Sequence, residues 1–140
     1  MIRIYSNVHK DLLLLSLIKK DSITHKRQDL SPDKEFLQVS AKKITSNDIF
    51  KAHKHLSCDK KANTTQESWV ILDGKVLATI YDIDDKLIHE ETLENGDCIV
   101  LYAGAHSLKC LTDDAIMYEF KNGPYYGAEK DKVFIRLENE

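Results

Sequence analysis

The sequence predicts a mostly β protein, a single domain built as a small antiparallel β-barrel or jelly roll with one helix near the N-terminus. From Phe36 onward, short runs rich in β-branched and aromatic residues alternate with turn-forming residues. This spacing is typical of antiparallel sandwiches and barrels. A chain of 140 residues can form one hydrophobic core. We therefore expect an N-terminal helix and loop over 1–35, a barrel over 36–121 and a C-terminal extension over 122–140.

The apolar run LLLLSLI, residues 12–18, is the segment expected to form the helix. Ser6 or Asn7 can cap its start, and Lys19 and Lys20 suit the negative end of a helix dipole. The run is much shorter than the roughly 20 residues that cross a bilayer. No membrane segment is therefore expected.

Eight strands are expected after this helix, in an order that predicts a β-meander closing on itself. Tight hairpin turns are predicted at Asp73-Gly74 and Asn95-Gly96, with a weaker turn at Asp84-Asp85, because these residue types tolerate positive φ. The expected strands are FLQVSAKKIT (36–45), IFKAHKH (49–55), SWVIL (68–72), KVLATIYDI (75–83), KLIHEETL (86–93), CIVLY (98–102), HSLKCL (106–111) and AIMYEFK (115–121).

Composition excludes several classes of function. The net charge of -3 provides no basic field for nucleic acid, and among five glycines there is no phosphate-binding loop. A G-x-S-x-G nucleophile motif is also missing. The three cysteines (Cys58, Cys98 and Cys110) have no C-x-x-C spacing, which favours a reducing compartment and hence the cytoplasm.

Four residues from three predicted strands form a candidate metal site. His53 and His55 are two apart, so on a strand they share a face. Glu67 opens the strand that ends at the Asp73-Gly74 turn, and His106 begins a later one. Three imidazoles and a carboxylate suit a divalent transition metal with open positions for water or substrate.

The order His-x-His, Glu-x6-Gly and then Ala-Gly-x-His resembles the two signature motifs of the cupins, small β-barrels that bind a metal inside. The resemblance covers roughly residues 36–121. It implies that His53, His55, Glu67 and His106 bind one divalent ion, which could be zinc, iron, manganese or nickel. Gln66 competes with Glu67 for the carboxylate position, but the seven-residue step to the turn glycine favours Glu67.

The end of the chain is similar to the E-x-K-x-G-P-Y…D-K-x-F tail of the WbuC-type cupin fold metalloproteins, and RQDL (27–30) echoes their N-terminal segment. The resemblance implies a small ligand, a sugar or sugar nucleotide of polysaccharide biosynthesis, and a homodimer. The matching tail positions are Glu119, Lys121, Gly123, Pro124, Tyr125, Asp131, Lys132 and Phe134.

The sequence departs from the cupin pattern in both motifs. A polar insert, residues 56–66, separates His55 from Glu67, and it can loop out at the barrel rim or cap the mouth. The second motif has Tyr102 where proline is usual, and one residue rather than two separates Gly104 from His106.

Three functions are compatible with these residues. The metal could act as a Lewis acid on a carbonyl or hydroxyl oxygen of the ligand. Alternatively, the inward histidines could act as general bases in a metal-independent sugar-nucleotide isomerase or epimerase. The third possibility is a non-catalytic module that senses its ligand.

Three other side chains have simpler interpretations. His89 is expected on the surface. Cys110 follows His106 by four residues, so it is expected to be a core thiol on the inward face. Trp69 is expected to fill the barrel interior, although it could instead stack on a sugar.

Overall fold

The structure is a computed structural model that describes residues 1–49, 51–55, 61–62 and 64–135. The mostly β prediction is confirmed, because strands dominate this part of the chain and its one α-helix has four residues. The strands are β1 (Ile2–Tyr5), β2 (Leu13–Ile18), β3 (Gln28–Asp29), β4 (Ser40–Ala41), β5 (Glu67–Asp73), β6 (Lys75–Tyr81), β7 (Leu87–Glu94), β8 (Cys98–Leu101), β9 (Ala105–Cys110) and β10 (Ile116–Lys121); a 3-10 turn covers Lys20–Ser22, and α1 covers Ala128–Asp131.

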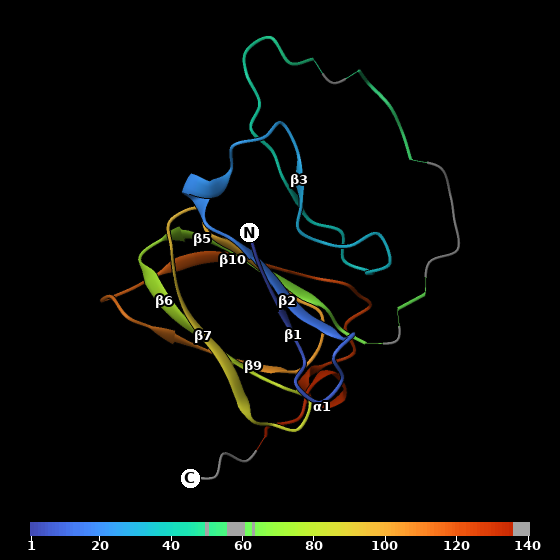
Figure 1. The fold of residues 1–140 in the computed structure, drawn as a ribbon, viewed down its shortest axis with the longest axis vertical. Helices are drawn as coiled ribbons and strands as arrows, with labels where there is room; N and C mark the ends of the chain where they lie inside the picture. Colours follow the sequence, from blue (N-terminus) through green and yellow to red (C-terminus); the bar gives the residue numbers. More distant parts are fainter. Residues whose placement is uncertain (50, 56–60, 63, 136–140) are drawn as a thin grey trace.

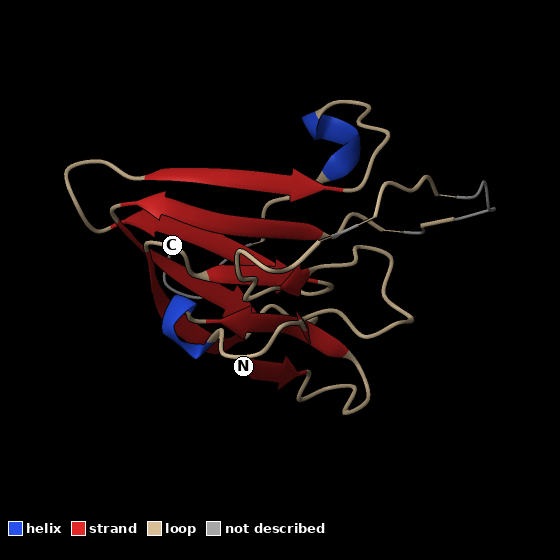
Figure 2. Cartoon of the chain, turned by 90° about the horizontal axis from the view of Figure 1, so that it is seen from above, coloured by secondary structure: helices blue, strands red, loops and turns tan. Residues whose placement is uncertain are grey.

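The strands form three antiparallel sheets (Figures 1 and 2). A five-stranded sheet has the order β1-β2-β8-β5-β10, a three-stranded sheet has the order β7-β6-β9, and β3 pairs with β4. The predicted meander is wrong, because consecutive strands such as β5 and β6 lie in different sheets. The chain instead crosses repeatedly between the two larger sheets.

The turn residues were predicted correctly, but two of the three hairpins were not. Gly74 and Gly96 have φ angles of 77° and 83°, yet each turn leads the chain from one sheet to the other. Only the turn at Asp84-Asp85 joins hydrogen-bonded neighbours, β6 and β7. Turn chemistry fixes where the chain reverses, whereas pairing depends on which apolar faces meet.

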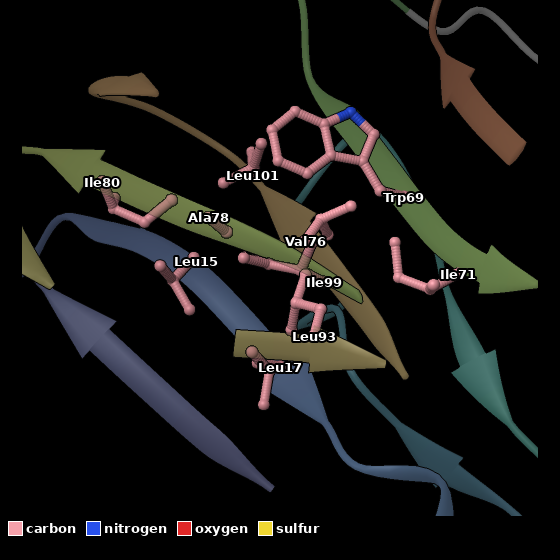
Figure 3. Close-up of a cluster of buried hydrophobic side chains, with 10 residues drawn as sticks. All are labelled: Leu15, Leu17, Trp69, Ile71, Val76, Ala78, Ile80, Leu93, Ile99 and Leu101. Atoms are coloured by element: carbon pink, nitrogen blue, oxygen red, sulfur yellow. The ribbon is translucent and has the colours of Figure 1, made fainter. Parts of the chain in front are cut away.

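A shared core lies between the two larger sheets (Figure 3). Strand β6 alternates buried and partly exposed residues, as expected for a strand with one covered face. Strands of the five-stranded sheet point their inner side chains at the same cluster. Its members are Leu15, Leu17, Trp69, Ile71, Val76, Ala78, Ile80, Leu93, Ile99 and Leu101.

The predicted N-terminal helix is wrong, because the apolar run forms β2. All six residues of β2 are buried, and its two faces serve different clusters: Leu15 and Leu17 join the shared core, while Leu13 and Ile18 join a second one. A short run that is buried on both faces carries no periodicity that separates strand from helix. Ser6 caps a turn instead of a helix, because its Oγ accepts hydrogen bonds from the backbone N–H groups of Val8 and His9.

The second cluster covers the outer face of the five-stranded sheet. Leu30 is fully buried there beside Val100 and Tyr102, and the Tyr102 hydroxyl donates to Ser31 Oγ at 3.1 Å. Partly buried residues of the 23–41 segment pack on the same cluster. This segment therefore acts as a cover for β2 and β8.

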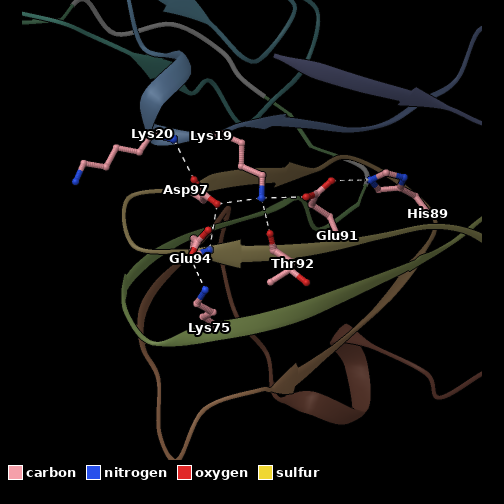
Figure 4. Close-up of polar contacts among 8 residues, drawn as sticks. All are labelled: Lys19, Lys20, Lys75, His89, Glu91, Thr92, Glu94 and Asp97. Carbon is pink, nitrogen blue, oxygen red and sulfur yellow. Dashed lines mark hydrogen bonds and ion pairs between the residues drawn. The ribbon is translucent and has the colours of Figure 1, made fainter.

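A polar network joins the two larger sheets near the ends of β2 and β7 (Figure 4). Lys19 forms ion pairs with Glu91 at 2.9 Å and with Asp97 at 3.1 Å. Burial alone would lower the pKa of Lys19, but the two carboxylates outweigh it and the pKa is raised. Asp97 also accepts the backbone N–H groups of Lys20 and Glu94. Lys19 therefore remains charged and holds the sheets together here.

Two predicted strands are reduced or missing in the described residues. Of the 36–45 segment, only Ser40–Ala41 is a strand. In the 49–55 segment, residues 49 and 51–55 are irregular, and residue 50 lies outside the described residues. No helix within the described ranges is long and apolar enough to span a membrane.

Candidate functional site

A cavity of about 930 Å³ opens where β5 begins and β10 ends. Its wall includes side chains from β5, β6, β9 and β10, together with residues 131–135 at the end of α1 and beyond. Glu67 on β5 and Lys121 on β10 are direct partners in the strand register. The cavity therefore combines polar ends of strands from both larger sheets.

Glu67 and His106 form the centre of this site. Oε2 of Glu67 lies 3.2 Å from Nε2 of His106, although the two residues belong to different sheets. The side chains are 14% and 32% exposed, so the pair is largely shielded but reachable. This contact requires a proton on Nε2 of His106, because the carboxylate of Glu67 can only accept a hydrogen bond.

The ionisation of Glu67 follows from its neighbours. The hydrogen bond from His106 lowers the pKa of Glu67, burial opposes this, and the charges of His106 and Lys121 add to the lowering. The net pKa lies below the ordinary value of 4.5. Glu67 is therefore a stable carboxylate at neutral pH, suited to orient an imidazole.

Lys121 stands among three carboxylates. Its Nζ lies 3.6 Å from Glu67, 3.4 Å from Glu119 and 3.6 Å from Asp131. The same ammonium lies 5.0 Å from the centre of the Tyr125 ring, within range of a cation–π contact. Burial would lower the pKa of Lys121, but the charges of Glu119 and Glu67 outweigh it and raise the pKa.

Asp131 fixes the C-terminal side of the cavity. The Thr65 hydroxyl donates to its Oδ1 at 2.7 Å, while Oδ2 faces Lys121. These contacts hold the end of α1 against the start of β5 and the end of β10. The segment after α1 consequently forms part of the cavity wall.

Trp69 closes the inner end of the cavity. It is 3% exposed, belongs to the shared core and meets the His106 ring edge-on with centroids 5.1 Å apart. The predicted filling role is confirmed. Its Nε1 is buried without a hydrogen-bond partner among the described residues.

Asp82, on the opposite wall, is a structural carboxylate. It is 2% exposed, and it accepts hydrogen bonds from the backbone N–H groups of Asn7 and Ile83. Burial would raise its pKa, but bonds from the Ser6 hydroxyl and these backbone groups lower it. Asp82 therefore ties the 6–12 turn to the end of β6 and keeps its charge.

Two of the four predicted metal ligands meet in the cavity, and two do not. His53 and His55 are exposed and lie on an irregular segment, with their rings edge-on to each other at 5.3 Å. Within the described ranges, no three His, Cys, Asp or Glu side chains form a group that could hold a metal ion. In this arrangement the four residues do not fit a common ion, so the four-ligand site stays a prediction. Most of the 56–66 insert, residues 56–60 and 63, lies outside the described residues.

Glu67, and not its neighbour Gln66, contacts His106. The neighbouring Gln66 is buried and points elsewhere: its Oε1 accepts from the Leu37 backbone at 2.8 Å and its Nε2 donates to Glu35 at 2.9 Å. Gln66 therefore anchors the covering segment. Gln66 directly precedes β5, and adjacent residues of an extended chain point in opposite directions.

The predictions for Cys110 and His89 fare differently. The inward position of Cys110 is wrong, because its side chain is exposed and its thiol donates to the Thr112 carbonyl oxygen at 3.2 Å. Cys110 is the last residue of β9, a strand that is exposed from His106 onward and contributes no residue to the shared core. His89 is 23% exposed and lies 3.5 Å from Glu91, so it is only partly a surface residue (Figure 4).

Sequence reasoning assigned no chemistry to Lys121, Glu119 or Asp131. All three had been noted as positions of the tail motif, and all three line the cavity. Glu119 and Lys121 are two apart on β10, so they share a face. That spacing was the available signal, but only the pairing of β10 with β5 reveals that the face is the cavity wall.

Comparison of the chain with protein-family models, with curated proteins and with solved structures found no match.

Proposed function

We propose that this protein binds a small hydroxylated ligand of carbohydrate type in the cavity, and that Glu67 and His106 act together as a proton-transferring pair. The contact between Glu67 Oε2 and His106 Nε2, at 3.2 Å inside a cavity of about 930 Å³, is the observation that supports it. A carboxylate that fixes one imidazole nitrogen leaves the other as a general base. The cavity is in the size range of small-molecule sites.

The chemistry that suits this pair is the isomerisation or epimerisation of a sugar. Nδ1 of His106 would take a proton from a hydroxyl-bearing carbon next to a carbonyl group, and the C–H electron pair would form the double bond of an enediolate, with the negative charge on the former carbonyl oxygen. Return of the proton to the former carbonyl carbon, with the hydroxyl proton passing to the charged oxygen, would complete an isomerisation. Return of the proton to the other side of the original carbon would re-form the carbonyl group and give the epimer. Glu67 would stabilise the imidazolium formed in between.

Deuterium exchange tests this proposal directly. A panel of aldoses and ketoses is incubated with the protein in D₂O, and loss of the proton signal next to the carbonyl is followed by NMR. We expect exchange with the wild type and a loss of about 100-fold or more in His106→Asn. His9→Asn, at an exposed histidine of the 6–12 turn, is the matched control.

Two outcomes would contradict parts of the proposal. Ligand binding can be measured by the fluorescence of Trp69, which is the single tryptophan of the chain. Binding of a sugar without deuterium exchange would favour a sensing module over an enzyme. Exchange that persists in His106→Asn would contradict the role of the histidine. Neither outcome depends on knowing the natural ligand.

Metal binding on a cupin-type barrel is the second candidate. The observation that favours it is the adjacency of Glu67 and His106, two of the four expected ligands, on strands of facing sheets. Stoichiometric metal analysis of the wild type beside His53→Ala and His106→Ala tests it. We expect metal in the wild type and a loss in both variants, and full metal content in both would contradict the four-ligand site.

A further inference from the structure

The cavity carries more negative than positive side chains. Among the described residues, the basic side chains that line it are Lys121 and Lys132, together with the imidazole of His106. The acidic residues that line it are Glu67, Asp82, Asp85, Glu119 and Asp131. The lining therefore has an excess of negative charge at neutral pH.

The positive charge nearest the centre is already engaged. Three carboxylates lie within 3.6 Å of Lys121 Nζ, so one ammonium faces three negative groups. A phosphate that approached Lys121 would have to displace one of them and would meet the other two. Such like-charge contacts disfavour anions, and low-dielectric walls strengthen the effect.

Glu119 is the member of this group that an incoming cation can reach. Its side chain is 47% exposed, whereas those of Glu67 and Asp131 are 14% and 15% exposed. Glu67 is also bound by His106, and Asp131 by the Thr65 hydroxyl. Of the three carboxylates around Lys121, Glu119 is thus the one with open access to solvent.

We propose that the ligand of this cavity carries an amine and no phosphate, as an amino sugar does, and that Glu119 binds its ammonium group. The inference rests on the proposed function, because it specifies the class of carbohydrate bound. Trp69 also lines the cavity, and its buried Nε1–H lacks an acceptor among the described residues. A sugar hydroxyl supplies that acceptor, and the amine supplies the partner for Glu119.

Three sugars that differ only in charge test the proposal: glucosamine, glucose and glucose 6-phosphate. Their dissociation constants are measured by Trp69 fluorescence and calorimetry near pH 6.5, where an amine of this kind is largely protonated. We expect glucosamine to bind about tenfold more tightly than glucose, and glucose 6-phosphate to bind most weakly. Added salt should reduce these differences.

Glu119→Gln keeps the shape of the side chain and removes its charge, so the advantage of glucosamine over glucose should fall to about twofold or less. Glu94→Gln is the matched control, because Glu94 is a 55% exposed carboxylate paired with Lys75 and does not line the cavity. It should leave the advantage unchanged. An unchanged advantage in Glu119→Gln would overturn the role of Glu119.

Failure of the inference differs from failure of the proposed function. Glucose 6-phosphate that binds at least as tightly as glucosamine would overturn the preference for an amine and leave a carbohydrate site in place. Absence of binding for all three sugars would overturn the proposed function together with the inference.

Discussion

Glu67 and Lys121 face each other directly across the β5–β10 pair, and Lys121 Nζ lies 3.6 Å from Glu67 Oε1. Because β10 is an edge strand, this single pair connects the core of the five-stranded sheet to the cavity and, through Asp131, to the C-terminal helix. The charge state of Glu67 thus depends on residues of two other strands, His106 on β9 and Lys121 on β10.

Removing the positive charge at position 121 should raise the pKa of Glu67. In Lys121→Met, three carboxylates remain close together with no ammonium between them, and like charges favour protonation. The carboxyl carbon shift of Glu67, followed by NMR as the pH falls, measures the change. Lys75→Met, which removes a lysine paired with Glu94 outside the cavity, should leave the titration of Glu67 unchanged. A Glu67 titration that is the same in Lys121→Met and wild type would show that Lys121 contributes no field at this carboxylate.

Glu67 should also make stability depend on pH in acid. Its pKa is lower in the folded protein than the ordinary 4.5, so its contribution is fully present above about pH 4.5 and is lost as the pH falls through the lowered value. We expect Glu67→Gln to reduce the free energy of unfolding by about 1 kcal/mol at neutral pH. The difference between wild type and variant should shrink in acid.

Urea unfolding of both proteins at pH 7 and near pH 3 measures this difference. Asp29→Asn is a useful control, since Asp29 forms an ion pair with Arg27 that is half-exposed on both sides. A gap between wild type and Glu67→Gln that widens in acid would contradict the lowered pKa.

The strands from Glu67 onward could be predicted because their apolar residues alternate and turn residues separate them. The alternation also placed Glu67, Trp69 and Ile71 on one face, which is the face that holds the core and the cavity. β2 could not be predicted in this way, since both of its faces are buried and every position is apolar or small. The sequence also could not predict that consecutive strands such as β5 and β6 belong to different sheets. A turn at Gly74 has the same local sequence whether or not the strands on either side of it pair with each other.

The candidate site was predicted in part for the same reason. Glu67 and His106 meet because each stands near the start of a strand whose neighbours cover the cavity. Contacts of Lys121 with Asp131 require the chain to turn after β10 and return through α1, and no short-range pattern encodes that return. His53 and His55 were expected to share a face because residues two apart on a strand do so. Their segment is not a strand, so this expectation does not apply.

Gly74 should not tolerate a side chain. Its φ of 77° disfavours other residues, and a Cβ would lie 2.5 Å from the Asp114 backbone oxygen. We expect Gly74→Ala to lower the free energy of unfolding by about 2 kcal/mol or more, because backbone strain and a clash with immobile backbone add. Gly127→Ala separates the two causes, since Gly127 has a φ of 99° and no atom within 4 Å of the added Cβ.

Thermal and urea unfolding of the two glycine variants provide the comparison. Gly127→Ala should cost only the backbone strain, so it should be the milder change. Equal losses in both variants would mean that the approach of the 112–115 segment to Gly74 contributes nothing to stability.

Loss of the Asp82 carboxylate should loosen the turn that joins β1 to β2. In Asp82→Ala the backbone N–H groups of Asn7 and Ile83 lose their acceptor in a buried position. We expect a loss of about 1–3 kcal/mol in the free energy of unfolding and faster hydrogen exchange of these two amides. Asp84→Ala is the control, because Asp84 forms an ion pair with Lys86 on the exposed side of the turn between β6 and β7, and little change is expected there. If the two variants lose similar stability, or if exchange at Asn7 is unaffected in Asp82→Ala, the carboxylate does not anchor the turn.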